Sequence, residues 1–255
     1  MKTVHFVMQG KGGVGKTFIS SILAQYLQSS TDSRVTCFDT DPVNKSFSHI
    51  KALNVSAVDL FTEHQLIDPG KFDVLMEQIL QSDTHVVVDN GASSFVPLLS
   101  YLRETKISAL FDELGLKAIL HVPLQGGSSE NDTLLGLATI LDSLSIDVVP
   151  WINNYGGEVI AGSKSFEDYA LYKKYKNRIR GVVSLQNHNP DTFGKDIRKM
   201  TSNHLTFDEV AQSENFFIIN KQRILLFKRG IYEQLDALNL GETHESRTVE
   251  KERQA

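Results

Sequence analysis

The sequence has a single cysteine, Cys37, which excludes an internal disulfide and any metal site built from several thiolates. Because Cys37 lies in the apolar segment RVTCFD, we expect it to be a buried core residue. No apolar run approaches the roughly 20 residues that a membrane-spanning helix needs. The first residues have the pattern of a strand, not of a secretory signal, so we expect a cytoplasmic protein.

Positive charge is not in excess either, since the formal net charge is -5. Binding to nucleic acid would therefore need a local basic patch. The chain has 255 residues, of which 41% are hydrophobic, and this is enough for one large α/β domain. No internal repeat and no Pro- or Gly-rich linker divides it, so we predict a single domain over residues 1–240. Residues 241–255, GETHESRTVEKERQA, have almost no apolar side chains and are predicted to be disordered.

Short apolar runs alternate with helical stretches along the first two thirds of the chain. The runs are TVHFVMQ, RVTCFDTD, THVVVDN, KAILHVPL and IDVVPWINN. Helices are expected from Lys16 to about Gln28, around Lys71 to Gln81 and in DTLLGLATILDSL. Apolar strands without alternation are typical of a parallel sheet that is covered on both faces. We therefore predict a doubly wound, mostly parallel α/β sheet with helices on both faces. Beyond Asn154 we expect one more strand, in RIRGVVSL, and a final helix from about Phe216 to Leu238.

The segment GKGGVGKT, residues 10–17, matches the P-loop pattern. In this pattern Lys16 reaches the β and γ phosphates and the Thr17 hydroxyl binds Mg²⁺. The segment follows a strand and opens an amphipathic helix, whose N-terminus favours an anion. The alternative is a flexible glycine turn between a strand and a helix. The residues expected at an ATP–Mg²⁺ site are Gly10, Lys11, Gly12, Gly13, Val14, Gly15, Lys16, Thr17 and Phe18.

A lysine directly after the first glycine resembles the deviant Walker A motif of the ParA/MinD family of ATPases, which have a SIMIBI-type P-loop NTPase fold. The resemblance implies that Lys11 crosses the interface of a homodimer formed on ATP binding and contacts the partner's phosphates. Two polyphosphates that face each other repel, and a cation about 4 Å from a phosphate oxygen contributes roughly 4 kcal/mol at an effective dielectric of 20. The alternative is a solvated surface lysine.

Three aspartates and a glycine accompany the loop. Asp39 and Asp41, in RVTCFDTDP, are two apart at a strand end, so we expect their side chains to start on the same face. The segment resembles switch I of the family, which implies that Asp41 orients the attacking water and Asp39 supports the magnesium shell. The alternative is a pair that caps a helix. THVVVDNGAS looks like Walker B and switch II, with Asp89 holding magnesium through water and the Gly91 N–H approaching the γ-phosphate.

The segment VVPWINNYGG follows the last long apolar strand. The family commonly uses an Asn at this strand end to read the base, so Asn153 is the expected adenine contact and Asn154 the second candidate. An Asn before Gly-Gly is equally a turn former. We expect Trp151 to be a core or interface residue.

The stretches QGKGGVGKTFI, DTDPVN, DNGASSFVPL and LTFDEVA resemble the TraL/StbB group of conjugative plasmid proteins, a branch of the ParA/MinD superfamily. The likeness runs through most of residues 3–238. It implies a slow ATPase switch in conjugal transfer or in plasmid stability or partition. It also implies a plasmid-encoded partner that binds DNA or belongs to the transfer apparatus, and through it a peripheral location at the nucleoid or inner membrane.

Other functions remain open. A metabolic ligase of the same fold and a nucleotide-binding scaffold without catalysis are the alternatives, whereas Cys37 alone cannot support an electron carrier. In the last helical segment, FFIINKQRILLFKRGIYEQLDAL, apolar and basic residues mix. We expect it to pack on the sheet, because it is long and carries Glu233 and Asp236; contact with a membrane or with DNA phosphates is the alternative.

Overall fold

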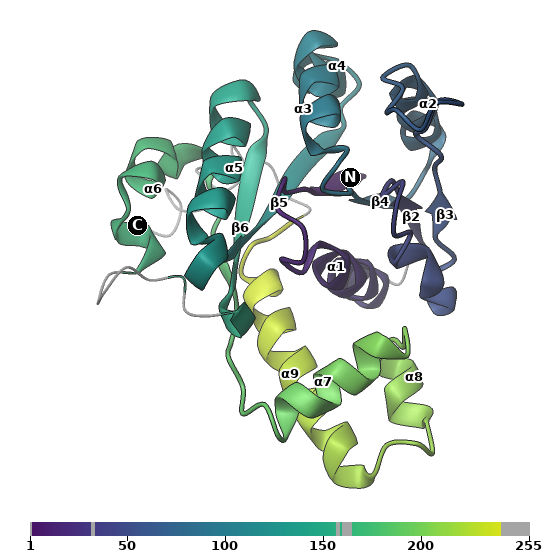
Figure 1. The fold of residues 1–255 in the computed structure, drawn as a ribbon, viewed down its shortest axis with the longest axis vertical. Helices are drawn as coiled ribbons and strands as arrows, with labels where there is room; N and C mark the ends of the chain where they lie inside the picture. Colours follow the sequence, from purple (N-terminus) through teal and green to yellow (C-terminus); the bar gives the residue numbers. More distant parts are fainter. Residues whose placement is uncertain (1, 32–33, 157–158, 160–164, 241–255) are drawn as a thin grey trace.

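The computed structural model describes residues 2–31, 34–156, 159 and 165–240, so the predicted disordered tail lies outside the described residues. Its centre is a seven-stranded sheet with the order β3-β2-β4-β1-β5-β6-β7, in which every paired strand is parallel (Figure 1). The predicted parallel sheet is confirmed. The strands are β1 (Thr3–Val7), β2 (Val35–Asp39), β3 (Ser56–Ala57), β4 (His85–Asp89), β5 (Lys117–Gln125), β6 (Asp147–Asn153) and β7 (Val183–Leu185).

Helices cover both faces of the sheet (Figure 1). One face lies under α2 (Lys71–Gln81), α3 (Phe95–Glu104), α4 (Ile107–Glu113) and α5 (Glu130–Ser143). The other face lies under α1 (Lys16–Thr31) and α9 (Ile218–Asp236), with α7 (Phe193–Ser202) and α8 (Phe207–Gln212) beyond them. The remaining helix, α6 (Ala170–Tyr175), lies beside α5 (Figure 1). Short 3-10 helices include Phe47–His49 and Lys51–Leu53, which follow β2.

Strand β4 shows why the apolar runs do not alternate with polar residues. Side chains alternate across a strand, and Val86 and Val88 of β4 belong to one apolar core while Val87 belongs to the other. Since helices cover both faces, both sets of side chains are buried. Cys37 and Trp151 are buried in the second core, as expected.

The order of the strands predicts where a ligand binds. β1 lies between β4 and β5. The strands on its β4 side, β2, β3 and β4, come before β5, β6 and β7 in the sequence. The topology therefore reverses at β1, and ligands of doubly wound folds bind beyond the carboxyl ends of the strands at such a point. The glycine-rich segment 10–17 follows β1 and lies at this position.

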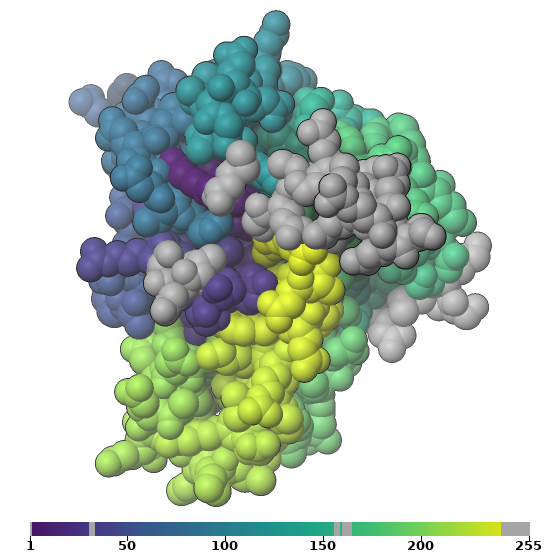
Figure 2. Space-filling model, turned by 180° about the vertical axis from the view of Figure 1, so that it is seen from behind, coloured from purple at the N-terminus to yellow at the C-terminus, as the bar shows by residue number. Residues whose placement is uncertain are grey.

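The final helix packs on the sheet, as we expected. Ile224, Phe227, Ile231 and Leu235 are buried in the core beneath α1. Seen from behind, the upper part of α9, drawn in yellow, lies against α1 (Figure 2), where the Tyr26 hydroxyl donates to Asp236 over 2.9 Å.

The basic residues of α9 are partly neutralised by the neighbouring helices. Arg223 pairs with Asp196 of α7 at 2.6 Å, and Lys228 pairs with Asp208 of α8 at 2.9 Å. The start of α9 is different, because Ile218 is 86% exposed. None of the described helices is long and apolar enough to cross a bilayer.

One predicted strand is shorter than expected. In RIRGVVSL the strand β7 covers only Val183–Leu185. Ile179 makes an isolated bridge with Val148, and the chain between Ile179 and Val183 leaves the sheet. Gly181 lies in this interruption with φ +156°.

A chain of three buried side chains crosses the α1 face of the sheet. The indole Nε1 of Trp151 donates to Nδ1 of His121 over 2.9 Å. An indole N–H can only donate, so Nδ1 of His121 accepts and its Nε2 carries the proton that is donated to Nδ1 of His5 over 2.9 Å. The proton of His5 is then on Nε2, which is buried without a hydrogen-bond partner among the described residues.

Burial keeps both imidazoles neutral. It lowers the pKa of His121 to about 3, with a smaller effect from the positive charge of Arg180. Burial also lowers the pKa of His5 well below its usual value, and His121, His85 and Arg180 add to this effect.

Candidate functional site

The segment after β1 has a conformation that requires glycine at two positions. Gly13 has φ +76° and Gly15 has φ +94°, a region that residues with a side chain rarely adopt. A Cβ on Gly15 would also lie 2.9 Å from Nδ2 of Asn153, and one on Gly10 would lie 3.0 Å from the ring of Phe95. The loop therefore fits closely between the ends of β6 and α3.

The two lysines of the loop occupy different environments. Lys16 is only 9% exposed, and its Nζ donates to the carbonyl oxygen of Lys11 over 3.0 Å. Burial lowers the pKa of Lys16, against the opposing charges of Asp89 and Asp41. Lys11 lies on the outside, where its Nζ is 2.8 Å from Oδ2 of Asp132 in α5. The two side chains of this ion pair are 40% and 57% exposed.

Two buried carboxylates lie side by side at the strand ends. Asp39 of β2 and Asp89 of β4 are partners in the strand register. Asp89 accepts hydrogen bonds from the hydroxyls of Thr17, over 2.6 Å, and Ser20, over 2.9 Å. Burial raises the pKa of Asp89 to about 7, against the hydrogen bond from Thr17.

Asp39 is held by backbone donors. It accepts the N–H groups of Asp41 over 3.1 Å and Ser48 over 2.9 Å. Burial raises its pKa, and these hydrogen bonds oppose the effect. The structure thus brings together the three residues predicted to surround a magnesium ion, Thr17, Asp39 and Asp89.

Asp41 lies in a turn beyond β2, so the expectation that it shares a strand face with Asp39 is wrong. The Thr40 N–H still donates to the carbonyl of Asp89 over 2.9 Å, but the Asp41 N–H donates to Oδ1 of Asp39 over 3.1 Å and Pro42 has no N–H, so the strand ends at Asp39. Asp41 accepts the N–H groups of Val43 and Asn44 on Oδ1, over 2.9 and 3.1 Å. A Cβ on Gly91 would lie 2.9 Å from Cα and Cγ of Asp41, so these two predicted residues are in direct contact.

Asn153 lies at the end of β6 and bridges two segments. Its Nδ2 donates to the carbonyl of Val14 over 3.0 Å, and its Oδ1 accepts the N–H of Tyr155 over 3.1 Å. Asn154 accepts the N–H of Val159 over 3.3 Å. The role of Asn153 as the base contact stays a prediction.

Three contacts of the site were not anticipated. Ser20 bonds Asp89, and its signal was the spacing from Thr17, because residues three apart share a helix face. Asp132 holds Lys11 and had no local signal. Gln9 is buried; its Oε1 accepts the N–H of Gly10 over 2.9 Å, and its Nε2 donates to the carbonyls of Pro123 and Thr133 over 3.1 and 3.0 Å. The signal for Gln9 was a polar side chain at the end of an apolar run.

A loop of this conformation at the switch point of a parallel sheet is how P-loop proteins hold a nucleotide, and the molecule is of that class. More narrowly, the chain belongs to the CobQ/CobB/MinD/ParA nucleotide-binding domain family, whose sequence model matches residues 5–223. It is 38% identical over 239 residues to a Protein TraL of Escherichia coli, an alignment that covers 93% of this chain and 98% of that protein. A second Protein TraL of E. coli is 34% identical over 238 residues, covering 92% and 98%.

Solved structures support the same fold. The MinD cell division protein of Aquifex aeolicus superposes with a TM-score of 0.50 at 17% identity, over 94% of this chain and 98% of that chain. A MinC:MinD cell division protein complex from A. aeolicus gives a TM-score of 0.51 at 18% identity, over 94% and 97%. At these identities the likeness establishes the fold alone.

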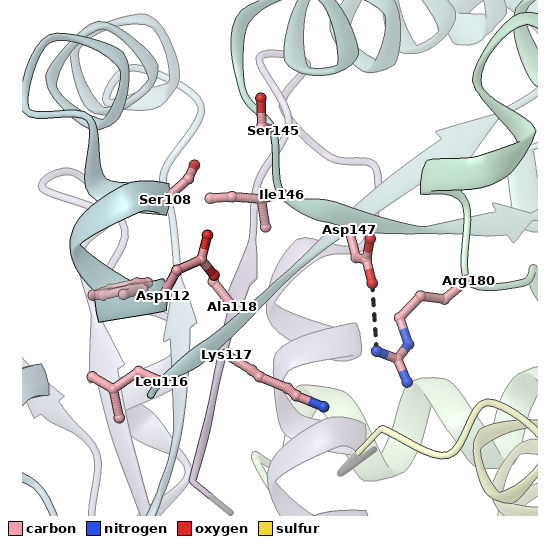
Figure 3. Close-up of a pocket in the computed structure, with 10 residues that line it drawn as sticks. Ser108, Asp112, Leu116, Lys117, Ala118, Ser145, Ile146, Asp147 and Arg180 are labelled. Atoms are coloured by element: carbon pink, nitrogen blue, oxygen red, sulfur yellow. Dashed lines mark hydrogen bonds and ion pairs between the residues drawn. The ribbon is translucent and has the colours of Figure 1, made fainter. Parts of the chain in front are cut away.

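A pocket of about 190 Å³ lies at the amino ends of β5 and β6, whereas the phosphate loop lies at the carboxyl ends of the strands (Figure 3). Asp147 and Arg180 point toward each other there, with 3.5 Å between Oδ2 and Nη1. Arg180 also donates to the carbonyls of Leu238 and Asn239 over 3.3 and 2.7 Å. This pocket is distinct from the phosphate loop, and Arg180 in it anchors the chain after α9.

Proposed function

We propose that the protein is an ATP-binding, slowly ATP-hydrolysing dimeric switch that acts in the conjugal transfer, stability or partition of a plasmid. The plasmid role rests on the resemblance to the TraL/StbB group and on relatives that bear the name Protein TraL. A plasmid-encoded partner, which binds DNA or belongs to the transfer apparatus, would read the nucleotide state. Any location at the nucleoid or inner membrane would follow from that partner.

The observation that carries the proposal is that Lys16 and Lys11 of the same loop lie in different environments. Lys16 is buried within the loop, whereas Lys11 is held on its rim by an exposed ion pair with Asp132. An exposed pair of this kind contributes about 0–1 kcal/mol. Asp132 offers Lys11 a single negative charge, whereas a triphosphate in a closed interface would offer several and would be screened less by water. Exchange of Asp132 for a second protomer's triphosphate would therefore be favourable and would link association to nucleotide binding.

The side chains present fit a magnesium ion. Thr17, Asp39 and Asp89 offer only oxygen ligands, the type that Mg²⁺ prefers. Among the described residues no cluster of three or more His, Cys, Asp or Glu side chains could hold a metal. A magnesium ion would thus be shared with nucleotide phosphates, as is usual for Mg²⁺, and would supply charge neutralisation there.

The remaining residues of the site would bind the phosphates or orient the water molecule that attacks. Lys16 and the backbone of the glycine-rich loop hold the phosphates, and Gly91 allows its N–H to approach the γ-phosphate. Both hydrogen bonds that Asp41 accepts from the described residues use Oδ1, which leaves Oδ2 for a water molecule. Asp41 would orient this water for attack on the γ-phosphorus, and the ADP β-phosphate oxygen would leave.

Light scattering during size-exclusion chromatography tests the switch. The wild type is expected to become a dimer with ATP–Mg²⁺ and to remain a monomer with ADP. Lys11→Ala should bind ATP but stay monomeric, whereas Lys173→Ala, at an exposed lysine of α6, should dimerise normally. A Lys11→Ala protein that dimerises like the wild type would remove the proposed coupling.

Hydrolysis is tested separately at Asp41. Asp41→Ala should bind ATP and lose hydrolysis by about 10²-fold or more, because positioned acid–base groups contribute on the order of 10²–10⁴ in rate. Phosphate release measured under single-turnover conditions gives the rate without interference from product release. Hydrolysis at the wild-type rate would exclude Asp41 from this role.

A further inference from the structure

A cavity of about 600 Å³ lies between α1 and α7, next to the phosphate loop, and of the residues expected at the ATP–Mg²⁺ site it shares Thr17 and Phe18. Thr17 and Ser46 are on its wall, whereas none of residues 10–16 and neither Asn153 nor Asn154 lines it. In Figure 1, α7 lies below α1, on the side of the sheet away from α5. Ligand pockets usually measure about 300–1,000 Å³, so a small ligand or a few residues of a peptide would fit.

The wall of the cavity is largely apolar. Phe18 comes from the first turn of α1, Ile50 from the segment after β2, and Met200 and Leu205 from α7 and the turn that follows it. Ile50 and Met200 are buried, while Phe18 and Leu205 are partly exposed. An apolar side chain of a ligand would therefore be covered on several sides.

The rim carries positive charge without compensating acids. Lys195, Arg198 and Lys199 are exposed, follow the i, i+3, i+4 spacing of one helix face, and line the cavity. In the part of the chain that the structure describes, no Asp or Glu lines it. Arg198 donates to the hydroxyl of Tyr155 over 3.1 Å and to the carbonyl of Pro190 over 2.6 Å. Lys199 donates to the carbonyl of Asn215. These acceptors are neutral, so the charges remain available to an anionic ligand.

We propose that this cavity binds an acidic peptide segment of a partner protein. One apolar side chain of the peptide would insert between Phe18 and Met200, and flanking carboxylates would lie against Lys195 and Arg198. Positive potential at the rim selects an acidic partner, and a buried apolar anchor is typical of peptide recognition. Nucleic acid fits less well, because a phosphodiester backbone would leave the apolar wall uncovered.

The location couples this site to the proposed switch without depending on it. Thr17 belongs both to the cavity wall and to the group around Asp89, and Ser46 lies in the segment after Asp41. A peptide seated here would sense movement of that segment. Binding can nevertheless be measured on nucleotide-free protein, so a failure of ATP-dependent dimerisation leaves the peptide result independent.

Selection from a random dodecapeptide library on the purified, nucleotide-free chain tests the proposal. We expect enriched sequences to carry carboxylates on both sides of an apolar residue. Fluorescence anisotropy with a labelled peptide from this selection should show binding that weakens at least tenfold in Lys195→Glu. Lys173→Glu makes the same change at an exposed position of α6 and should leave the affinity within twofold of the wild type.

Three results would overturn the proposal. The first is a selection that enriches no acidic-apolar sequences. The second is a peptide affinity that is equal in Lys195→Glu and the wild type while thermal unfolding shows that both are folded. The third is tighter binding to short duplex DNA than to the selected peptide, with the DNA affinity lost in Lys195→Glu, since that would assign the rim to nucleic acid.

Discussion

Mild acid should destabilise the fold through the buried histidines. In the unfolded chain His5 and His121 have pKa values of about 6.5. In the folded chain burial lowers the pKa of both, that of His121 to about 3. Below pH 6.5 the unfolded state therefore binds protons that the folded state does not, and stability falls as pH falls. The surrounding groups, His85 of β4 and Arg180, oppose protonation further.

The magnitude follows from linkage. Between pH 7.5 and pH 5.5, each histidine that stays neutral in the fold is expected to lower the free energy of unfolding by about 1.4 kcal/mol. His5 and His121 together give about 2.7 kcal/mol. Urea unfolding followed by circular dichroism at a series of pH values measures this loss. Other ionisable groups also contribute, so the informative quantity is the difference between the wild type and a matched variant.

His5→Asn is that variant. The asparagine Oδ1 can accept the proton that His121 donates to Nδ1 of His5, and the substitution removes one titrating ring. The pH-dependent loss should therefore fall by about half the histidine contribution, about 1.4 kcal/mol. His64→Asn, at an exposed histidine, should leave the loss unchanged. Equal pH dependence in His5→Asn and the wild type would show that His5 does not stay neutral in the fold.

Three further substitutions probe the site. Asp132→Asn removes the charge that holds Lys11 on the rim and should tighten ATP-dependent dimerisation by up to about fivefold, since an exposed pair is worth about 1 kcal/mol at most; weaker dimerisation would contradict this. Gly136→Ala would place a Cβ 1.9 Å from Oε1 of the buried Gln9, and we expect a loss of about 2–3 kcal/mol in urea unfolding. Wild-type stability would mean that Gln9 can move without cost. Asn153→Ala should weaken ATP binding by about tenfold and leave GTP binding unchanged in calorimetry. Equal weakening of both nucleotides would assign the residue to bracing the loop instead of reading the base.

Local pattern was enough to predict much of the fold. Strands that are buried on both faces predicted the parallel sheet, because both sets of alternating side chains are apolar in a strand such as β4, at Val86, Val87 and Val88. The glycine-rich segment and its lysine were recognisable since their spacing is fixed by backbone conformation, as the positive φ angles of Gly13 and Gly15 show. Helix α2, Lys71–Gln81, lies where the sequence predicts a helix.

The contacts that could not be predicted join distant parts of the chain. Asp132 meets Lys11 across 121 positions, and Gln9 meets Thr133 across 124, so no local spacing reveals either. Both contacts depend on the packing of α5 on β5. The sequence misplaces Asp41 for a local reason, because its N–H donates to Oδ1 of Asp39 and the chain leaves the strand there.

Side chains of two buried residues hold the phosphate loop at its first glycine and at Val14. Gln9 ties its first glycine to β5 and α5, and Asn153 ties Val14 to the end of β6. Fixing the backbone of one residue costs about 1–2 kcal/mol of conformational free energy, and in this loop that cost is already part of folding. A nucleotide would thus meet a preorganised loop, and residues remote from the phosphates, such as Gly136, would influence its affinity through the position of Gln9.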